Sequence, residues 1–316
     1  MRAVRFHDFG PPSVLRVEEA PDPEIEDDLL LVRVAATGLN PIDTDIRGGR
    51  VSGVLTGTPP RGLGVEVAGT VVRSGPLASR YREGDRVIGT MPTFKGEGYA
   101  EFVALPEEDA APWPQNLSAP EAASMPLAAL TALQALRAKG GLRARHRVLI
   151  HGASGGVGTM AVQIAALLGG EVVATASAEH LDLVRSLGAH EAVDYRAEDV
   201  TRRDGFDLVF DVAGTLPFGL ARPMLRSAGA YITTQVSPGV VTRTVLQKAM
   251  PGPVMAYSQA APDGPALEWL ATLFASGAAR VVMDRTFAMD EAPQAHAHLE
   301  GPHGPGKCAL IVDESQ

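Results

Sequence analysis

A glycine-rich segment in the middle of the chain, Gly152-Ala153-Ser154-Gly155-Gly156-Val157-Gly158, most strongly constrains the fold. The apolar run Val148 to His151 predicts a short strand before it, and the apolar spacing of Val157 to Leu168 predicts a helix after it. A strand, a tight glycine turn and a helix N-terminus let the backbone approach a dinucleotide pyrophosphate closely. We therefore predict a nucleotide-binding turn, with an unliganded glycine-rich connection as the alternative. Its expected contacts are Ala153, Ser154, Gly155, Gly156, Val157 and Gly158.

The same segment also fits the pattern G-x-S-x-G, which is typical of α/β-hydrolases. In that alternative Ser154 is the nucleophile, Asp211 follows a later strand, and His296 or His298 completes the triad. No HGGG-type oxyanion segment precedes the turn, which argues against this alternative. A Walker A loop is excluded because no lysine follows the glycines in the required place.

The end of the next predicted strand, Thr175-Ala176-Ser177, carries no carboxylate. A site for NAD expects an acidic residue there, about 20 residues after the glycines, to bind the ribose hydroxyls. Glu179 opens the following helix instead. Without an acid a 2′-phosphate is not repelled, and Ser177, His180 and Arg196 could bind it, although His180 also fits a solvated helix position. The sequence therefore favours NADPH over NADH.

Strands and helices alternate after the glycine turn, which predicts an α/β fold with a doubly wound parallel sheet. Before residue 115 the chain contains strand and turn signals, and helix signals run from residue 118 to 138. Met224 to Ala228 is predicted to lie in a helical stretch. Further strands are expected at 172–176, 191–195, 206–212, 230–234, 254–257, 280–287 and 308–312, and further helices at 179–187, 265–276 and 290–299.

Charge and cysteine content restrict the class of protein. Lys and Arg number 28 against 37 Asp and Glu, so the net charge of −9 argues against nucleic acid or an anionic membrane as the main partner. The single cysteine, Cys308, allows no intramolecular disulfide and no cysteine-rich zinc site. The first ten residues lack the apolar core of a signal peptide. We expect a soluble, cytoplasmic protein with a small-molecule substrate.

Several short motifs occur in a characteristic order along nearly the whole chain. By them the chain resembles the medium-chain dehydrogenase/reductase superfamily, in its zinc-independent quinone oxidoreductase (ζ-crystallin-like) branch. Singly each motif is unspecific, and their order and spacing carry the resemblance. Besides the glycine turn, the motifs are Gly38-Leu39-Asn40-Pro41-Ile42-Asp43, Gly64-Val65-Glu66-Val67-Ala68-Gly69, Tyr81-Arg82-Glu83-Gly84-Asp85-Arg86-Val87, Gly98-Tyr99-Ala100-Glu101, Ala122-Ala123-Ser124-Met125-Pro126-Leu127, Leu130-Thr131-Ala132, Leu187-Gly188-Ala189, Asp194-Tyr195-Arg196 and Gly306-Lys307.

The resemblance implies a Rossmann domain and a β-rich, GroES-like catalytic domain built from both chain ends. We expect the catalytic domain at residues 1–118 and 259–316 and the Rossmann domain at 119–258, with the active cleft between them. A homodimer is expected as well. Loops such as Gly48 to Arg61 and Val236 to Gly252 are expected to shape the acceptor pocket, so the sequence does not identify the acceptor.

The resemblance also implies that no catalytic zinc is bound. Zinc-dependent relatives place a cysteine where this chain has Asn40 and a histidine where it has Val65. His296, His298 and His303 cluster near the C-terminus, but no acid is spaced from them like a known ligand, so a solvated surface is expected there. We expect no metal site.

The family pattern further suggests the residues that act on the acceptor and the cofactor. Asn40 is expected near the nicotinamide, where its amide could polarise a developing oxyanion, or it could simply begin a turn with Pro41. Asp43 is expected to orient that loop or act as an acid. His151 is expected to be a packed strand-end residue. Further cofactor contacts are implied at Thr131, Tyr195 and Lys307.

Three functions follow from these features. The first is an NADPH-dependent, zinc-independent oxidoreductase that reduces quinones or α,β-unsaturated carbonyls by hydride transfer. The second is a non-catalytic, NADPH-binding redox sensor. The third is a serine hydrolase that uses Ser154.

Overall fold

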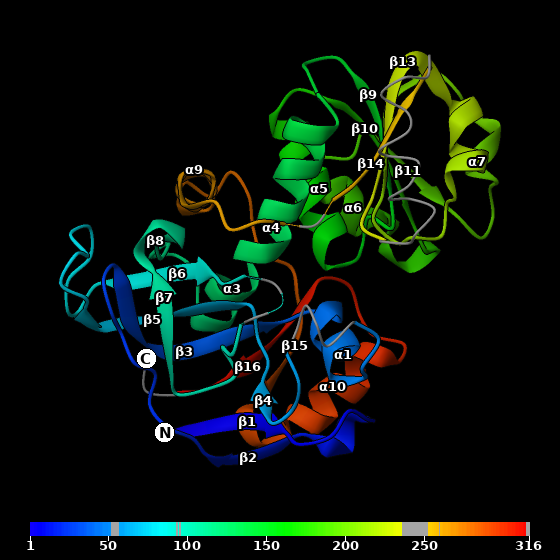
Figure 1. Cartoon of the computed structure of the whole chain (residues 1–316). Helices are drawn as coiled ribbons and strands as arrows, with labels where there is room; N and C mark the ends of the chain where they lie inside the picture. Colours follow the sequence, from blue (N-terminus) through cyan, green and yellow to red (C-terminus); the bar gives the residue numbers. More distant parts are fainter. Residues whose placement is uncertain (52–56, 93, 95, 236–251, 259, 314–316) are drawn as a thin grey trace. The chain divides into compact units, whose positions relative to one another are not determined.

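The computed structural model of the chain describes residues 1–51, 57–92, 94, 96–235, 252–258 and 260–313. The chain divides into two compact units, one formed by Met1–Leu130 with Ala261–Gln316 and the other by Thr131–Ala260. Figure 1 shows both chain ends, blue and red, in one unit and the green and yellow middle of the chain in the other. These units change at 130/131 and 260/261, whereas the predicted functional domains change at 118/119 and 258/259, and those domain limits stay a prediction.

The middle unit is built on one six-stranded sheet in the order β11-β10-β9-β12-β13-β14, in which every neighbouring pair is parallel. Within this unit the chain enters the sheet at the central strand β9 and adds β10 and β11 on one side. It then returns to the other side of β9 and adds β12, β13 and β14. This is the doubly wound order, and the topological switch point lies between β9 and β12. The strands are β9 (Arg147–His151), β10 (Glu171–Ala176), β11 (Glu191–Asp194), β12 (Phe206–Asp211), β13 (Leu225–Thr233) and β14 (Val254–Tyr257).

Helices cover both faces of this sheet. α5 (Gly156–Leu167) packs on β9 and β10, and α6 (Leu181–Ser186) packs on β10 and β11. α7 (Phe218–Ala221) contacts β13 on the opposite side (Figure 1). α5 ends where Gly169 takes a φ of 81°, a left-handed conformation that glycine adopts without strain. The predicted α/β fold with a doubly wound parallel sheet is confirmed.

The other unit contains two sheets. A three-stranded sheet has the order β2-β1-β4, and a seven-stranded sheet has the order β15-β16-β3-β5-β6-β8, with β7 paired to β3. The strands are β1 (Arg2–Phe6), β2 (Arg16–Glu19), β3 (Leu29–Leu39), β4 (Arg61–Gly62), β5 (Glu66–Ser74), β6 (Arg86–Thr90), β7 (Phe102–Pro106), β8 (Ala110–Pro112), β15 (Met283–Ala288) and β16 (Lys307–Ile311).

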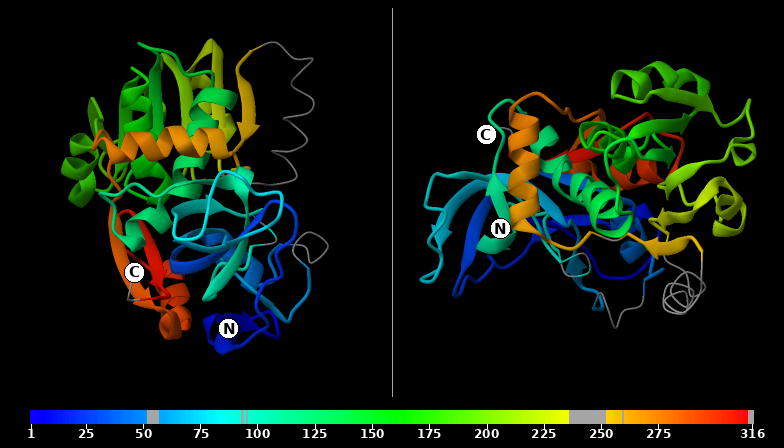
Figure 2. Two further views of the ribbon diagram at one scale, coloured as in Figure 1. Left: turned by 90° about the vertical axis from the view of Figure 1, so that its left-hand side faces the viewer. Right: turned by 90° about the horizontal axis from the view of Figure 1, so that it is seen from above.

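The two chain ends join in that sheet, because β16 pairs antiparallel with β3 and sets Cys308 opposite Leu39. Figure 2 shows the blue and red segments within the same unit from two further directions. Apolar side chains from both ends share one core, which includes Leu39, Phe287 and Leu310. The helices are α1 (Pro41–Arg47), α3 (Ala119–Ser124), α4 (Pro126–Leu133, which ends in the middle unit), α9 (Gly264–Ala275) and α10 (Ala292–Glu300).

Two predicted elements differ from the structure. The prediction that Met224 to Ala228 is helical is wrong, because β13 begins at Leu225 and pairs with β12. The helical region expected from 118 to 138 is divided into α3, α4 and a π-helix at Gln134–Lys139. Pro126 begins α4, where its ring fits a first helical turn but would break a continuous helix. In the described ranges, the helices are too short or too polar to cross a bilayer.

Candidate functional site

The glycine turn connects β9 to α5 at the carboxyl ends of the parallel strands. It lies next to the point between β9 and β12 at which the strand order reverses. Gly152 has a φ of 85°, and a Cβ added there would crowd Ala213. A Cβ at Gly158 would collide with the carbonyl oxygen of Gly152, so α5 lies tightly against the turn. At Gly155 only one atom lies within contact range of an added Cβ, at 3.6 Å. Gly152 and Gly158 are therefore needed for the backbone path, because a side chain at either position would be crowded. Gly155 leaves space beside the turn for a ligand.

The N-terminus of α5 is suited to an anion. Gly155 is its N-cap residue, and among the described residues no side chain accepts the first N–H groups of this helix. Uncapped N–H groups and the helix dipole favour a negative group at that end. The turn thus fits a dinucleotide pyrophosphate, which would meet backbone atoms from Ala153 to Gly158.

His151 supports the turn from below. Its Nδ1 lies 2.8 Å from Thr175 Oγ1 and its Nε2 lies 3.0 Å from Thr215 Oγ1, while Thr175 Oγ1 accepts the N–H of Gly152 at 3.2 Å. Burial lowers the pKa of His151, which keeps the imidazole neutral. The neutral ring bonds through one nitrogen to Thr175 of β10 and through the other to Thr215. These contacts fit the packed strand-end residue that the sequence predicts.

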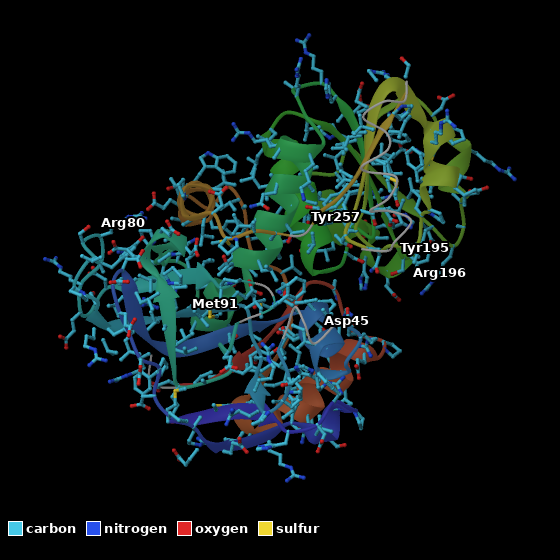
Figure 3. The ribbon with its side chains drawn as sticks, in the orientation of Figure 1. Asp45, Arg80, Met91, Tyr195, Arg196 and Tyr257 are labelled. Carbon is cyan, nitrogen blue, oxygen red and sulfur yellow. The ribbon has the colours of Figure 1, made fainter. Side chains whose placement is uncertain are left out.

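The carboxyl ends of β10 and β11 bring the predicted phosphate-binding residues to one edge. Ser177 follows β10, and Tyr195 and Arg196 follow β11, its parallel neighbour. Tyr195 is 47% exposed, and the guanidinium of Arg196 lies 5.4 Å from its ring centroid. Figure 3 shows the two side chains at the surface of this unit.

Glu179 changes the electrostatics at this edge. It lies in a 3-10 turn (Ala178–His180), where its Oε1 accepts the hydroxyl of Ser177 at 2.9 Å and lies 3.9 Å from His180 Nε2. Thr175-Ala176-Ser177 carries no carboxylate, as the sequence shows, but the turn folds the Glu179 side chain back onto Ser177 and so brings an acid to the end of this strand. The acid competes for the groups that were expected to bind a 2′-phosphate.

Asp211 and both candidate histidines of the alternative serine-hydrolase triad contact other partners within their own units. Asp211 accepts backbone N–H groups from Gly214, Thr215 and Leu216 and the hydroxyl of Tyr231, and burial raises its pKa. His298 binds Asp284, and His296 packs edge-on against Tyr99. A nucleophile elbow also requires a strained turn at the serine. Among the described non-glycine residues, positive φ occurs at Asp27 and Arg145, not at Ser154.

A buried polar cluster surrounds Asn40 in the unit formed by the chain ends. Lys307 Nζ donates to Asn40 Oδ1 at 2.6 Å, to Glu66 Oε1 at 2.8 Å and to the carbonyl of Leu39 at 3.0 Å. Asn40 Nδ2 donates to the same Glu66 oxygen at 2.9 Å, and Leu127 N donates to its other oxygen at 2.7 Å. Glu66 is fully buried, and Asn40 and Lys307 are each 5% exposed. The Lys307 ammonium thus fixes the amide oxygen of Asn40, and the Glu66 carboxylate fixes its amide nitrogen.

Asp43 anchors the backbone of the same loop. Its carboxylate accepts the N–H of Asn40 at 3.1 Å, the N–H of Gly64 at 3.0 Å and the hydroxyl of Tyr99 at 3.1 Å. Burial raises the pKa of Asp43 to about 7, against the opposing effect of these donors and of Lys307. Through the N–H of Asn40, the N-cap residue of α1, the Asp43 carboxylate also caps the start of this helix. Asp43 therefore orients the Asn40 loop, one of the two roles expected for it.

Two cofactor contacts implied by the resemblance lie apart from the glycine turn in sequence and differ in setting. Thr131, in α4, is 7% exposed, and its carbonyl accepts the hydroxyl of Ser258 at 3.3 Å. Lys307 directs its three donor contacts into the Asn40 cluster. The predicted roles of both residues stay predictions.

Glu66 and Tyr99 have no role in the sequence-based site. Both stand in motifs that carry the resemblance, but their function depends on partners far along the chain, such as Lys307 and Asp43. The available signal for Glu66 is a charged residue within the otherwise apolar run 64–72. Residues 52–56 and 236–251 of the expected acceptor loops lie outside the described residues.

Known proteins match this chain over its full length. A family model described as alcohol dehydrogenase GroES-like domain matches residues 26–115, and one described as zinc-binding dehydrogenase matches residues 187–310. Quinone-oxidoreductase QR1 of Triphysaria versicolor is 31% identical over 98% of both chains. The NADPH-dependent alkenal/one oxidoreductase of Arabidopsis thaliana is 32% identical over 98% of this chain and 79% of its own.

A solved structure agrees with these relatives. Escherichia coli quinone oxidoreductase complexed with NADPH superposes with a TM-score of 0.83 at 26% identity, over 99% of this chain and all of the other. Together with the doubly wound sheet and the paired chain ends, these likenesses confirm the predicted family. The chain belongs to the medium-chain dehydrogenase/reductase superfamily, in its zinc-independent quinone oxidoreductase branch.

Proposed function

We propose that this protein is an NADPH-dependent oxidoreductase that reduces quinones or α,β-unsaturated carbonyls without a catalytic zinc. The observation that carries the proposal is the open glycine turn at the switch point of a parallel sheet, in a chain whose full-length relatives are named quinone and alkenal/one oxidoreductases. When bound, the nicotinamide supplies a hydride. The residues of the chain bind the nucleotide and orient the acceptor.

The backbone from Ala153 to Gly158 holds the pyrophosphate in this proposal. Tyr195 and Thr131 contact the rest of the nucleotide. Ser177, His180 and Arg196 favour a 2′-phosphate, while Glu179 opposes it. We infer that NADPH is preferred over NADH and that Glu179 limits the size of that preference.

Asn40 polarises the acceptor oxygen in this proposal. One Nδ2 hydrogen is donated to Glu66 at 2.9 Å, and the second meets the Gly38 carbonyl only at 3.4 Å. The second hydrogen, with only this long contact, is therefore the one that can donate to a developing oxyanion. Asp43 acts as a positioning residue through the backbone of Asn40, and the reduced acceptor takes its proton from water.

We further propose a homodimer formed along β14. This strand is one edge of the six-stranded sheet, and Val254 on it is 48% exposed. An unpaired edge can extend its sheet through a second copy. A cytoplasmic location stays a prediction, and sedimentation of the purified protein measures the oligomeric state.

Fluorescence titration with NADPH and with NADH tests the cofactor, and loss of NADPH absorbance across a panel of quinones, enones and enals tests the activity. Tight NADPH binding with turnover of a quinone or an enone supports the proposal. Binding without turnover of any acceptor indicates the non-catalytic redox sensor. Labelling of Ser154 by a fluorophosphonate, without nucleotide binding, indicates the hydrolase.

A further inference from the structure

A second cluster of chemically active side chains lies beside the joined chain ends. Asp284 on β15, His298 on α10 and Cys308 on β16 each direct one ligand atom into a common space, and these atoms all lie within 4.8 Å of one another. His298 Nε2 is 2.7 Å from Asp284 Oδ2, and Cys308 Sγ is 3.6 Å from the same oxygen. Three different donor types from three elements therefore meet at one point.

We propose that Asp284, His298 and Cys308 form a zinc site that fastens α10 to β15 and β16. Thiolate, imidazole and carboxylate are the ligands that zinc takes in proteins. Asp284 lies 14 residues before His298, and the β15–β16 pairing brings it next to Cys308, so no short spacing in the sequence links it to the histidines. These positions differ from Asn40 and Val65, where zinc-dependent relatives hold their metal.

The spacing of the ligand atoms suits a tetrahedral ion. Zinc bonds of about 2.0–2.3 Å place tetrahedral ligands roughly 3.3–3.8 Å apart. The sulfur–oxygen distance of 3.6 Å lies in that range, and the nitrogen–oxygen distance of 2.7 Å needs to open by less than about 1 Å. Small side-chain shifts thus convert the hydrogen-bonded cluster into a coordination site.

The surroundings hold the ligands in place while leaving an approach from solvent. Cys308 is 2% exposed, whereas the side chains of Asp284 and His298 are 13% and 21% exposed. Burial and the Asp284 carboxylate raise the pKa of Cys308 to about 11, so the group is a thiol until an ion displaces its proton; the backbone N–H of Arg285 opposes that rise. The ring of Phe287 lies 5.6 Å from that of His298 and fixes its orientation.

The loop before β16 lies against Asp284 and His298. A Cβ added at Gly304 would collide with Asp284, so this loop passes directly over the carboxylate. The ring of His303 lies 6.0 Å from that of His298, and its Nδ1 bonds to the Gly304 carbonyl at 2.9 Å.

Binding needs no redox step. The thiol of Cys308 releases its proton to water, and its sulfur bonds to the ion. His298 binds through Nε2 with its ring proton on Nδ1, and Asp284 binds as a carboxylate. Because Cys308 follows Lys307 in β16, the ion would also fix the strand that carries the ammonium of the Asn40 cluster.

Calorimetric titration of the chelator-treated full chain with Zn²⁺ tests the site, and Co²⁺ tests its ligands by absorption. We expect one Zn²⁺ per chain, a raised Tm, and the cobalt–thiolate charge-transfer band in the near ultraviolet. Cys308→Ser is expected to abolish that band. His298→Gln, which removes one of the three protein ligands, is expected to weaken zinc binding on the order of 100-fold.

His7→Gln is the matched control, since His7 is an exposed histidine 2.9 Å from the carboxylate of Glu18. This variant should bind zinc like the wild type. Absence of saturable zinc binding by the wild type would overturn the proposal. So would unchanged binding by His298→Gln, which decides the question even if Cys308→Ser does not fold.

Discussion

Replacing Lys307 by methionine tests whether the cluster around Asn40 depends on a buried ion pair. Methionine has a similar length but removes the three donor contacts to Leu39, Asn40 and Glu66. The fully buried Glu66 carboxylate then keeps two neutral donors, Asn40 Nδ2 at 2.9 Å and Leu127 N at 2.7 Å. The variant therefore leaves a buried negative charge without its counter-ion.

The expected loss of unfolding free energy depends on pH. Removing one partner of a buried ion pair costs about 3–5 kcal/mol. Hydrogen bonds to a charged group are worth about 1.5–3 kcal/mol each, so the two remaining donors place the loss near 3 kcal/mol at pH 7.5. The carboxyl group can instead take up a proton, which costs an ordinary glutamate about 4 kcal/mol at pH 7 and about 1 kcal/mol at pH 5.

The sign of the pH effect follows from proton binding. The folded variant would hold a proton that its unfolded chain releases as pH rises, so its stability falls with rising pH. We expect Lys307→Met to lose about 3 kcal/mol at pH 7.5 and about 1 kcal/mol at pH 5. Adding Glu66→Gln removes the charge and should recover more than half of the loss at pH 7.5.

Urea unfolding at both pH values measures these differences. Lys139→Met is the matched control, because Lys139 Nζ donates to the Tyr257 carbonyl at 2.8 Å rather than to a carboxylate. Lys139 is a charged donor like Lys307, so the loss should be about 1.5–3 kcal/mol for its one hydrogen bond, with the same value at both pH values. A loss from Lys307→Met that does not change with pH, or that simply adds to the loss from Glu66→Gln, would refute the reasoning.

Three other substitutions have expected outcomes of their own. Both ring nitrogens of buried His296 lack a hydrogen-bond partner among the described residues, and burial lowers its pKa to about 3. His296→Leu should therefore add about 1–2 kcal/mol to the unfolding free energy at pH 7.5. Below pH 6.5 the gain should grow by about 1.4 kcal/mol per pH unit, because the unfolded wild-type histidine binds a proton there. A lower stability of the variant in urea unfolding would contradict this. Glu179→Gln should tighten NADPH several-fold in fluorescence titrations and leave NADH nearly unchanged. Gly158→Ala should abolish NADPH binding, whereas Gly219→Ala, at a position with open space, should not.

The fold could be predicted because its signals are local. The glycine turn, the strand before it and the helix after it lie within about 20 consecutive residues and follow from periodicity and turn chemistry. Met224 to Ala228 failed for the opposite reason, since pairing with β12 overrides the local helical preference there. The pairing with β12, rather than the local sequence, thus determines the conformation of this segment.

The candidate site could be predicted only where one motif holds all its parts. Asn40 and Asp43 share a motif, and in the structure the N–H of Asn40 donates to the Asp43 carboxylate. Glu66 and Lys307 lie 241 positions apart and meet only because β16 pairs with β3. Glu179 was expected to open the helix after this strand, but it lies in a 3-10 turn before that helix, and no spacing rule reveals the direction of its side chain.

The Asn40 cluster also determines which atom of the amide can face an acceptor. A lysine ammonium only donates and a carboxylate only accepts, so Lys307 must meet Oδ1 and Glu66 must meet Nδ2. Reversing the amide would set Nδ2 against the ammonium and Oδ1 against the carboxylate, two repulsive contacts in a buried site. The remaining Nδ2 hydrogen therefore points in one fixed sense, and its partner, the Gly38 carbonyl at 3.4 Å, is a weak competitor for it. In the proposed reductase the ion pair thus orients a neutral amide donor, which can stabilise a developing oxyanion.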